Sequence, residues 1–202
     1  MVNTQVTSGS GAERRKSEIL SAAAKLFASR GIEATSVREI ADCVGLNPGA
    51  LYYYFPSKSS IAVELITGYL RALLDRYDHE GLEELEPRAR LKSIIDVSLA
   101  TGAASPDATK VYHAEFANLR ELRDYKTARD LTNRIQRIWL DAIESGQRTG
   151  VLRRDVPAKV FHRFLRDAVW FSVYWRTDAD EYPLEELSKD YLAVFLEGMV
   201  QR

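Results

Sequence analysis

The sequence predicts an all-α protein, and three features lead to this fold class. Apolar residues recur at spacings of three and four along nearly every segment of the 202-residue chain, which is the period of an amphipathic helix. No segment shows the sustained alternation of apolar and polar residues that is typical of strands. Glycine, proline and capping residues divide the chain into pieces of helical length. We therefore expect about nine helices and no sheet.

The first two expected helices have clear end signals. Residues 13–30 carry an apolar stripe and are followed by Gly31, and glycine commonly ends a helix. Ser36 and Glu39 then form a Ser-x-x-Glu capping box, which satisfies backbone N–H groups at the start of a second, short helix. Gly45 is expected to end that helix.

A third short helix is expected to follow at once. Asn47 can cap its N-terminus, and Pro48 fits its first turn, where the missing N–H is not needed. The helix should end by Phe55, and Ser57 then caps a long fourth helix that runs towards Tyr77. Two short helices joined by a glycine turn have the lengths and end signals of a helix-turn-helix.

Segments rich in glycine and proline divide the rest of the chain into five long helices. These breaks fall at residues 81–87, 102–106, 146–157 and 177–183. The widest apolar faces belong to residues 129–144, 157–175 and 184–200. The simplest division of the chain is a disordered tail at residues 1–12, a helix-turn-helix domain at 13–57 and a larger helical domain at 58–202.

Composition narrows the class of protein. The 46% hydrophobic and 28% charged residues are ordinary for a soluble globular protein, and no apolar run is long enough to span a bilayer. The polar N-terminus lacks the features of a targeting signal, so we expect a cytoplasmic protein without membrane contact. A single cysteine, Cys43, excludes an internal disulfide and a thiolate metal cluster, and its neighbour Val44 suggests that it is buried. We expect no metal and no cofactor.

Charge alone leaves DNA binding open. The formal net charge is −1, and residues 1–58 hold seven basic and five acidic side chains. This bias is slight, so the arrangement of residues has to decide.

The arrangement favours DNA. In a helix-turn-helix the second helix enters the major groove, and its exposed N-terminal face would consist of Asn47, Pro48, Gly49, Ala50 and Tyr53. Small residues on this face would let the helix lie close to base edges.

Three further residues suit the phosphate backbone. Tyr52 and Tyr54 flank the exposed face, and their hydroxyls can donate to phosphate oxygens. Lys58 adds a cation at the start of the next helix. The alternative, in which the tyrosines only pack an aromatic minicore, does not explain why the capping box, the turn and Lys58 are in register.

The segment TSVREIADCVGLNPGALYYYFPSKSSI closely resembles the DNA-binding signature of TetR-family repressors. The resemblance extends from Arg14 to about Ile66. It implies that Arg38 and Tyr53 contact bases and that Tyr52, Tyr54 and Lys58 contact phosphates. It also implies a dimeric repressor that binds a pseudo-palindromic operator and is released by a small-molecule effector.

The same resemblance assigns roles to the second domain. Residues 157–175 and 184–200 would form a four-helix bundle with the partner subunit. The segment RFLRDAVWFSVYW resembles the sensor helix of the KstR-like TetR branch that controls steroid-ring catabolism, whose members release DNA on binding a CoA thioester. By this resemblance Arg166 and Trp170 contact the effector. We expect Tyr112 and Trp139 to face the pocket as well. The segment from residue 103 to 125 looks less like that branch.

Other interpretations remain open at this point. Arg166 could instead form a buried ion pair with Asp167, Glu115 or Asp141, and the aromatic residues could be core. The chain could also be a TetR-type repressor of an efflux or other catabolic operon that senses an unrelated hydrophobic ligand, or a helical interaction protein that binds no DNA. An enzyme is disfavoured, because the three histidines are scattered and no catalytic motif is present.

Overall fold

The computed structural model describes residues 8–116, 122, 124–176 and 182–197, and within these ranges it contains helices and no strand. The α-helices are α1 (Ser8–Arg30), α2 (Val37–Cys43), α3 (Pro48–Tyr54), α4 (Lys58–His79), α5 (Pro87–Ala104), α6 (Pro106–Glu115), α7 (Lys126–Arg148), α8 (Ala158–Trp175) and α9 (Leu184–Tyr191). A 3₁₀ turn, η1 (Leu82–Glu84), precedes α5, and a π-helical segment, η3 (Leu192–Glu197), continues α9. The all-α prediction is confirmed.

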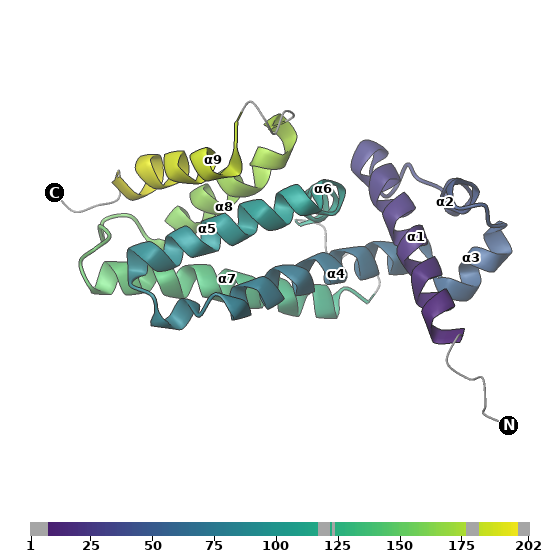
Figure 1. The fold of residues 1–202 in the computed structure, drawn as a ribbon, viewed down its shortest axis with the longest axis horizontal. Coiled ribbons are helices and arrows are strands. Elements are labelled where there is room, and N and C mark those ends of the chain that lie inside the picture. Colours follow the sequence, from purple (N-terminus) through teal and green to yellow (C-terminus); the bar gives the residue numbers. More distant parts are fainter. Residues whose placement is uncertain (1–7, 117–121, 123, 177–181, 198–202) are drawn as a thin grey trace, which may run out of the picture.

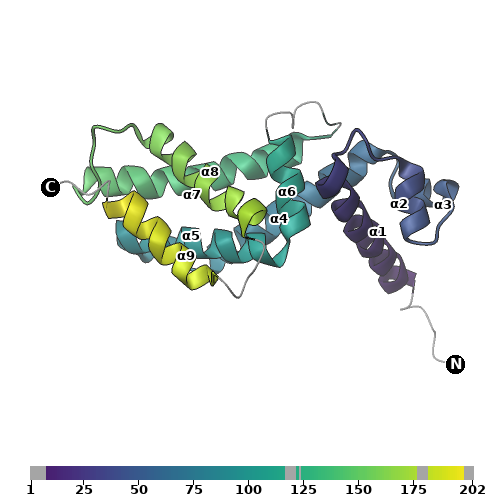
Figure 2. The same ribbon diagram turned by 90° about the horizontal axis from the view of Figure 1, so that it is seen from above.

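The molecule is elongated, with a small unit at one end. Figure 1 shows α1, α2 and α3 grouped at that end, and α4 running from them into the larger helical body. In the body α4 packs on α5 and α7, while α8 and α9 pack on α5. The turned view places α6 where the two parts meet, and α6 contacts both α1 and α4 (Figure 2).

Local capping produces the helix-turn-helix. The Ser36 hydroxyl accepts a hydrogen bond from the Glu39 N–H at 3.2 Å, and the Glu39 carboxylate accepts one from the Ser36 N–H at 2.8 Å. Gly45 has φ +65° in the turn, a conformation that favours glycine. The Asn47 side chain then accepts from the Ala50 N–H at 2.7 Å and starts α3. The expected caps and turn are therefore confirmed.

Three expectations about the chain ends and the cysteine need correction. Helix α1 begins at Ser8, so residues 8–12 are helical and not disordered, while residues 1–7 lie outside the described residues. The single helix expected at 184–200 is α-helical only to Tyr191 and π-helical to Glu197, and residues 198–200 lie outside the described residues. Cys43 is exposed, because it lies two residues beyond buried Ala41 and so projects from the opposite side of α2.

One apolar core extends through both parts of the molecule. Buried residues of the small unit and of the body belong to the same cluster, and α4 connects them through Ile61, Ile66 and Leu70. A change in the body can therefore reach the small unit through packed side chains as well as through the chain connection.

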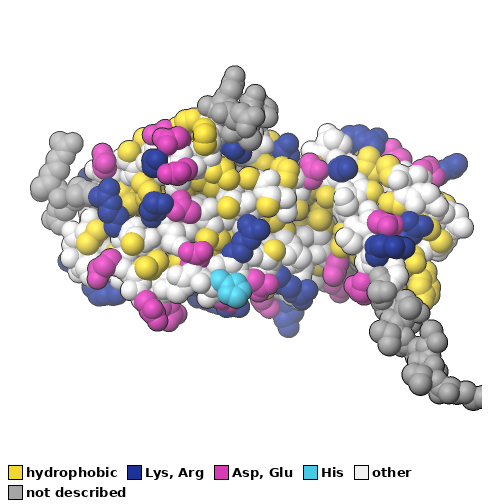
Figure 3. All heavy atoms as spheres, viewed as in Figure 1, with side chains coloured by type: hydrophobic (Ala, Val, Ile, Leu, Met, Phe, Trp, Pro, Cys, Tyr) yellow, Lys and Arg dark blue, Asp and Glu magenta, His cyan; other side chains and the backbone are white. Residues whose placement is uncertain are grey.

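The surface carries charges of both signs. Figure 3 shows basic and acidic side chains interspersed on both parts of the face it presents. Within the described ranges no helix is both long and apolar enough to cross a membrane.

We expect Gly146→Ala to destabilise the protein. A Cβ atom at this position of α7 would lie 2.7 Å from Cγ and Cδ1 of Leu152, a residue that is only 1% exposed and has little room to move. Overpacking of this kind costs about 1–3 kcal/mol. Urea unfolding at a fixed protein concentration measures the change.

Gly68→Ala is the matched control. It makes the same substitution inside a helix, but no atom lies within 4 Å of the new Cβ, so alanine should gain roughly 0.5–1 kcal/mol through its higher helix propensity. A Gly146→Ala variant as stable as Gly68→Ala would contradict the tight packing at Leu152.

Candidate DNA-reading surface and effector pocket

Helix α3 is anchored by its inner side. Leu51 is fully buried and Phe55 nearly so, and both belong to the same core cluster as Ile40 of α2. The outer side remains free: Asn47 and Gly49 are exposed, and three half-buried or exposed positions, Pro48, Ala50 and Tyr53, complete the face expected to enter the groove.

The three tyrosines differ in exposure. Tyr53 is the most exposed aromatic side chain of the described residues, at 86%, and Tyr52 is 51% exposed. Tyr54 is half-buried, and its ring packs edge-on against Tyr53 with ring centres 5.4 Å apart. Tyr53 is therefore the most exposed of the three, and Tyr52 flanks it. Tyr54 packs against the Tyr53 ring and keeps partial access to solvent.

The two expected cations lie in different settings. The Arg38 side chain is 82% exposed, and its Nε atom lies 4.0 Å from Oδ2 of Asp42 one turn later. Lys58 is half-buried, and its Nζ donates to the backbone carbonyl of Glu33 at 3.0 Å, which ties the start of α4 to the α1–α2 loop. An ammonium has three donors, so Lys58 can hold this bond and still contact a phosphate.

The four expected effector contacts line one pocket in the body. Tyr112 comes from α6, Trp139 from α7, and Arg166 and Trp170 from α8. The Tyr112 and Trp170 rings pack edge-on with centres 5.1 Å apart. The wall is completed by Phe116, Thr132, Ile135, Gln136 and His162.

The pocket is closed in this structure. Its free volume is about 10 Å³, which is room for roughly one water molecule. Sites for small organic ligands are typically about 300–1,000 Å³. Any effector of that size must displace the side chains of α6, α7 or α8 as it enters.

Arg166 closes one side of the pocket. Its guanidinium bonds Oδ1 of Asp167 at 2.6 and 2.8 Å and lies over the Phe116 ring, 4.7 Å from the ring centre. The ion pair with Asp167 that the sequence left open is therefore present. It does not remove Arg166 from the pocket, because the side chain still lines the cavity and is 17% exposed.

Trp170 presents an unpaired donor. The residue is 4% exposed, and its indole N–H has no hydrogen-bond partner among the described residues. A buried donor without an acceptor costs about 1–3 kcal/mol, so an acceptor on a bound molecule would recover that energy.

Tyr112 and Trp139 contribute their rings to the pocket wall, and their polar atoms are bonded elsewhere. The Tyr112 hydroxyl and the Thr132 hydroxyl are 3.2 Å apart, and the Trp139 indole N–H donates to the Tyr77 hydroxyl at 3.2 Å. Burial raises the pKa of both Tyr77 and Tyr112, so both hydroxyls remain protonated. The rings face the pocket while their polar atoms are already satisfied by the protein.

His162 is a pocket residue that the sequence analysis missed. It is 3% exposed, and its ring centre lies 6.0 Å from that of Trp139. Burial, and secondarily the Arg166 charge, lower the pKa of His162 to about 4, which leaves it neutral at pH 7. The signal was available, because residues 162, 166 and 170 follow one another at helical spacing on one side of α8.

The apolar residues expected on α8 divide between the core of the subunit and its exposed surface. Phe161, Leu165 and Val169 are buried in the subunit's own core. The exposed side carries Val160, Phe164, Phe171 and Trp175, and Phe164 is 61% exposed. Val194 of η3 is also exposed, at 70%, so α8 and η3 present an uncovered apolar surface suited to a partner.

Two family models match the chain, and together they span most of it. The model described as bacterial regulatory proteins, tetR family, matches residues 19–65, and the model described as tetracyclin repressor-like, C-terminal domain, matches residues 84–199.

Individual relatives agree with these models. The HTH-type transcriptional repressor KstR2 of Rhodococcus jostii (strain RHA1) is 33% identical over 190 residues, covering 94% of this chain and 93% of that protein. The solved structure of the ketosteroid transcriptional regulator KstR2 of Mycobacterium tuberculosis superposes with a TM-score of 0.83 at 30% identity, covering all of both chains. The fatty acid degradation regulator FadR of Bacillus halodurans, at 20% identity and TM-score 0.71, shares the fold. These relatives are transcriptional regulators, a class of protein that is not enzymatic.

The fold combines a helix-turn-helix that exposes one face of α3 with a helical body that contains a pocket, and both parts match the family. The chain therefore belongs to the TetR family and is a transcriptional repressor.

Proposed function

We propose that this repressor binds a pseudo-palindromic operator as a homodimer and is released by an acyl-CoA thioester that enters the pocket of α6, α7 and α8. The observation that carries the effector proposal is the convergence of Arg166 and the unpaired Trp170 N–H on one aromatic cavity. The Mycobacterium tuberculosis KstR2 relative is a ketosteroid transcriptional regulator, which favours a ligand with a steroid ring, and the thioester is what the resemblance of the α8 segment to the KstR-like branch implies.

The DNA side of the proposal assigns each exposed residue a role. Tyr53 and Arg38 contact bases, since they project furthest from α3 and α2. Asn47, Pro48, Gly49 and Ala50 allow close approach of the helix, and Tyr52, Tyr54 and Lys58 hold phosphates. In this proposal residues 13–57 are the DNA-binding domain and residues 58–202 bind the effector and the partner, and the protein acts on chromosomal DNA in the cytoplasm.

The chemistry of the pocket suits a molecule with an apolar body and several acceptor oxygens. Aromatic rings line the pocket together with the Arg166 guanidinium, the Trp170 N–H, His162 and Gln136. A thioester carbonyl can accept from Trp170, and a carboxylate or phosphate can pair with Arg166. A purely hydrophobic effector of the efflux type would leave the Trp170 N–H unsatisfied and would offer Arg166 nothing in place of Asp167, which makes it the less favoured ligand.

Helix α6 is placed to transmit the signal. Tyr112 and Phe116, at its C-terminal end, form part of the pocket wall, and α6 also packs against α1 of the DNA-binding unit. The Tyr112 ring contacts Tyr69 of α4, with ring centres 5.8 Å apart. A ligand that opens the pocket must displace these rings and therefore bias the positions of α1 and α4. By linkage, the bound ligand lowers the affinity for operator by the same factor by which bound operator lowers the affinity for the ligand.

The homodimer is proposed to form through residues 157–175 and 184–200. The exposed Phe164, Phe171 and Trp175 of α8, together with Val194 of η3, supply the apolar area that such an interface buries. In such a dimer the two copies of α3 would meet two half-sites. The centres of these half-sites would lie one helical turn, roughly 34–36 Å, apart, or a multiple of that distance.

Tyr52→Phe should weaken binding to every duplex by a similar factor, about five- to tenfold, because it removes one hydroxyl that donates to a phosphate. Arg38→Gln should instead change which sequences are preferred. Anisotropy of fluorescent duplexes, taken from the promoter beside the protein's own gene and from scrambled DNA, measures both effects.

Tyr125→Phe, which alters a tyrosine at the start of α7 in the body, serves as the control for the removal of a hydroxyl. If Tyr52→Phe and Arg38→Gln both bound DNA as the unaltered protein does, the assignment of the reading surface would be wrong.

The effector proposal predicts that a CoA thioester, but neither its free acid nor CoA alone, releases the labelled promoter duplex. Trp170→Phe keeps the apolar ring and loses the N–H, so it should need about tenfold more thioester. Arg166→Met should need more still, because it removes a charged contact. The panel consists of acyl-CoA and steroid-ring CoA thioesters titrated into the protein–DNA complex.

Arg163→Met is the matched control, since Arg163 lies on the same helix but is exposed and does not line the pocket. If the thioester released the labelled duplex equally well from Arg163→Met, Arg166→Met and Trp170→Phe, this pocket would be excluded as the effector site. Release by none of the thioesters would leave DNA binding intact and remove the acyl-CoA class.

The neutral state of His162 predicts a pH dependence of stability. The folded pKa is about 4 and the unfolded pKa is about 6.5. Between these pH values the unfolded chain takes up a proton that the folded chain does not, so the free energy of unfolding falls as the pH drops through this window. His162→Gln should have a shallower dependence, measured by urea unfolding from pH 7 to pH 4.

His79→Gln, which removes an exposed histidine at the end of α4, corrects for the general effect of removing an imidazole. A slope in His162→Gln as steep as in the unaltered protein would show that His162 is not held neutral.

A further inference from the structure

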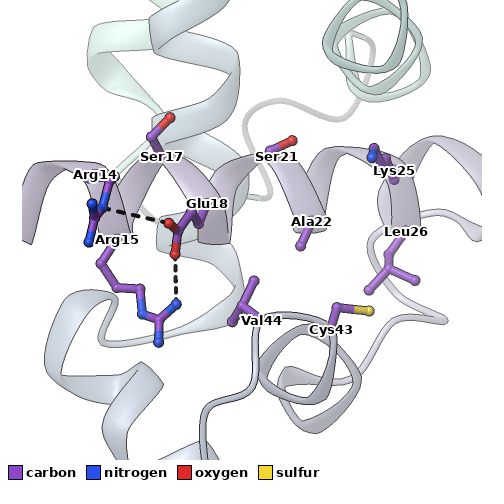
Figure 4. Close-up of a pocket in the computed structure, with 10 residues that line it drawn as sticks. All are labelled: Arg14, Arg15, Ser17, Glu18, Ser21, Ala22, Lys25, Leu26, Cys43 and Val44. Carbon is purple, nitrogen blue, oxygen red and sulfur yellow. Dashed lines mark hydrogen bonds and ion pairs between the residues drawn. The ribbon is translucent and has the colours of Figure 1, made fainter.

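A single carboxylate holds two arginines on α1. Nη1 of Arg15 lies 2.6 Å from Oε2 of Glu18, and Nε of Arg14 lies 3.8 Å from Oε1 of the same residue. Figure 4 shows both guanidinium groups beside the Glu18 carboxylate at one end of the drawn stretch of α1. Neither arginine is required by the core, because their side chains are 81% and 35% exposed.

The cluster lines a groove next to the turn of the helix-turn-helix. The groove has a volume of about 730 Å³, and Cys43 and Val44 form its opposite wall (Figure 4). Val44 leads through the turn directly to Asn47, which caps α3. The N-terminal end of α1, where the two arginines lie, points away from the ligand-binding helices in both views (Figures 1 and 2).

The chemistry of the α1 side of this groove suits a phosphate backbone. Arg14, Arg15 and Lys25 supply cations, and Ser17 and Ser21 supply hydroxyls, whereas Glu18 is the single acid among the residues that line it. Arginine, lysine and serine are the side chains that commonly donate to phosphate oxygens. This composition is not needed for folding, since the opposite face of α1 provides the buried residues Ile19, Ala23 and Phe27.

The ion pairs are easily exchanged. Exposed pairs between arginine and glutamate contribute little to stability. A DNA phosphate offers two non-bridging oxygens that share one negative charge, in a geometry that matches a guanidinium, and it releases a counterion when it is bound. A duplex seated on α3 therefore competes effectively with Glu18 for both arginines.

We propose that Arg14 and Arg15 are sequence-independent phosphate contacts and that Glu18 is the residue that positions them before DNA binds and limits the affinity of the complex. Glu18 holds the two guanidinium groups beside its carboxylate, in the groove that Val44 also lines. When DNA binds, a phosphate replaces the Glu18 carboxylate, and the carboxylate remains as a nearby negative charge that weakens binding.

The test compares four variants on two duplexes, a scrambled sequence and the promoter fragment, between 50 and 200 mM KCl. Replacing both arginines by methionine should weaken binding to both duplexes and lower the salt slope by roughly one for each phosphate that is no longer bound. Glu18→Gln should raise the affinity for both, by about two- to fivefold, because one nearby negative charge is removed.

Glu13→Gln is the matched control for charge. Glu13 is an exposed acid on the same helix, and the described residues show no ion pair to it. Its replacement should raise affinity less than Glu18→Gln does. The fourth variant combines Glu18→Gln with both methionines, and there the gain from Glu18→Gln should shrink to that of Glu13→Gln.

Two results would overturn the proposal. One is a double-methionine variant with unchanged affinity and salt slope. The other is a Glu18→Gln gain that equals that of Glu13→Gln or that persists without the arginines. Thermal unfolding of each variant checks that α1 is still folded, and the exposure of these side chains leads us to expect it.

Discussion

The packing of the Tyr112 ring is the contact on which the proposed response depends. Tyr112 lies on α6, is 1% exposed, and touches Tyr69 of α4 and Trp170 of α8. The ring therefore joins α8, which carries the proposed effector contacts, to α4, which leads into the DNA-binding unit. Because packed interiors have few alternative arrangements, a ligand that displaces this ring must shift helices as bodies and not only side chains.

The closed pocket sets an energetic condition on the effector. In the proposed mechanism, entry breaks aromatic contacts and loosens Arg166 from Asp167 and Phe116, so the ligand has to supply more than apolar area. The donors at Arg166 and Trp170 provide that addition only to ligands with acceptor oxygens. Selectivity would then follow from the free energy needed to open the pocket. A molecule that cannot accept hydrogen bonds from both Arg166 and Trp170 does not recover that free energy.

The sequence predicted what local signals determine and missed what tertiary packing determines. Capping at Ser36 and Asn47 is settled within three residues, so α2 and α3 were predicted closely. The face of Cys43, the division of the α8 stripe between core and surface, and the bond from Lys58 to the Glu33 carbonyl depend on segments that meet only in the fold. Resemblance grouped Arg166 with Trp170, and helical spacing could have added His162, but only the structure shows that the pocket is closed.

A protein with a net charge of −1 can still bind DNA if its cations are local and exchangeable. On this reading unit most arginines and lysines are held by weak partners: Glu18 holds two, Asp42 lies near Arg38, and a carbonyl holds Lys58. The carboxylates in these pairs reduce the long-range attraction that would hold the protein on random DNA, because each offsets one positive charge, whereas the carbonyl that holds Lys58 offsets none. In the proposed complex, phosphates displace those partners at close range, and the positive charge becomes available only where α3 has already fitted the groove. On that proposal, the acids near α3 favour discrimination between operator and bulk DNA over high affinity.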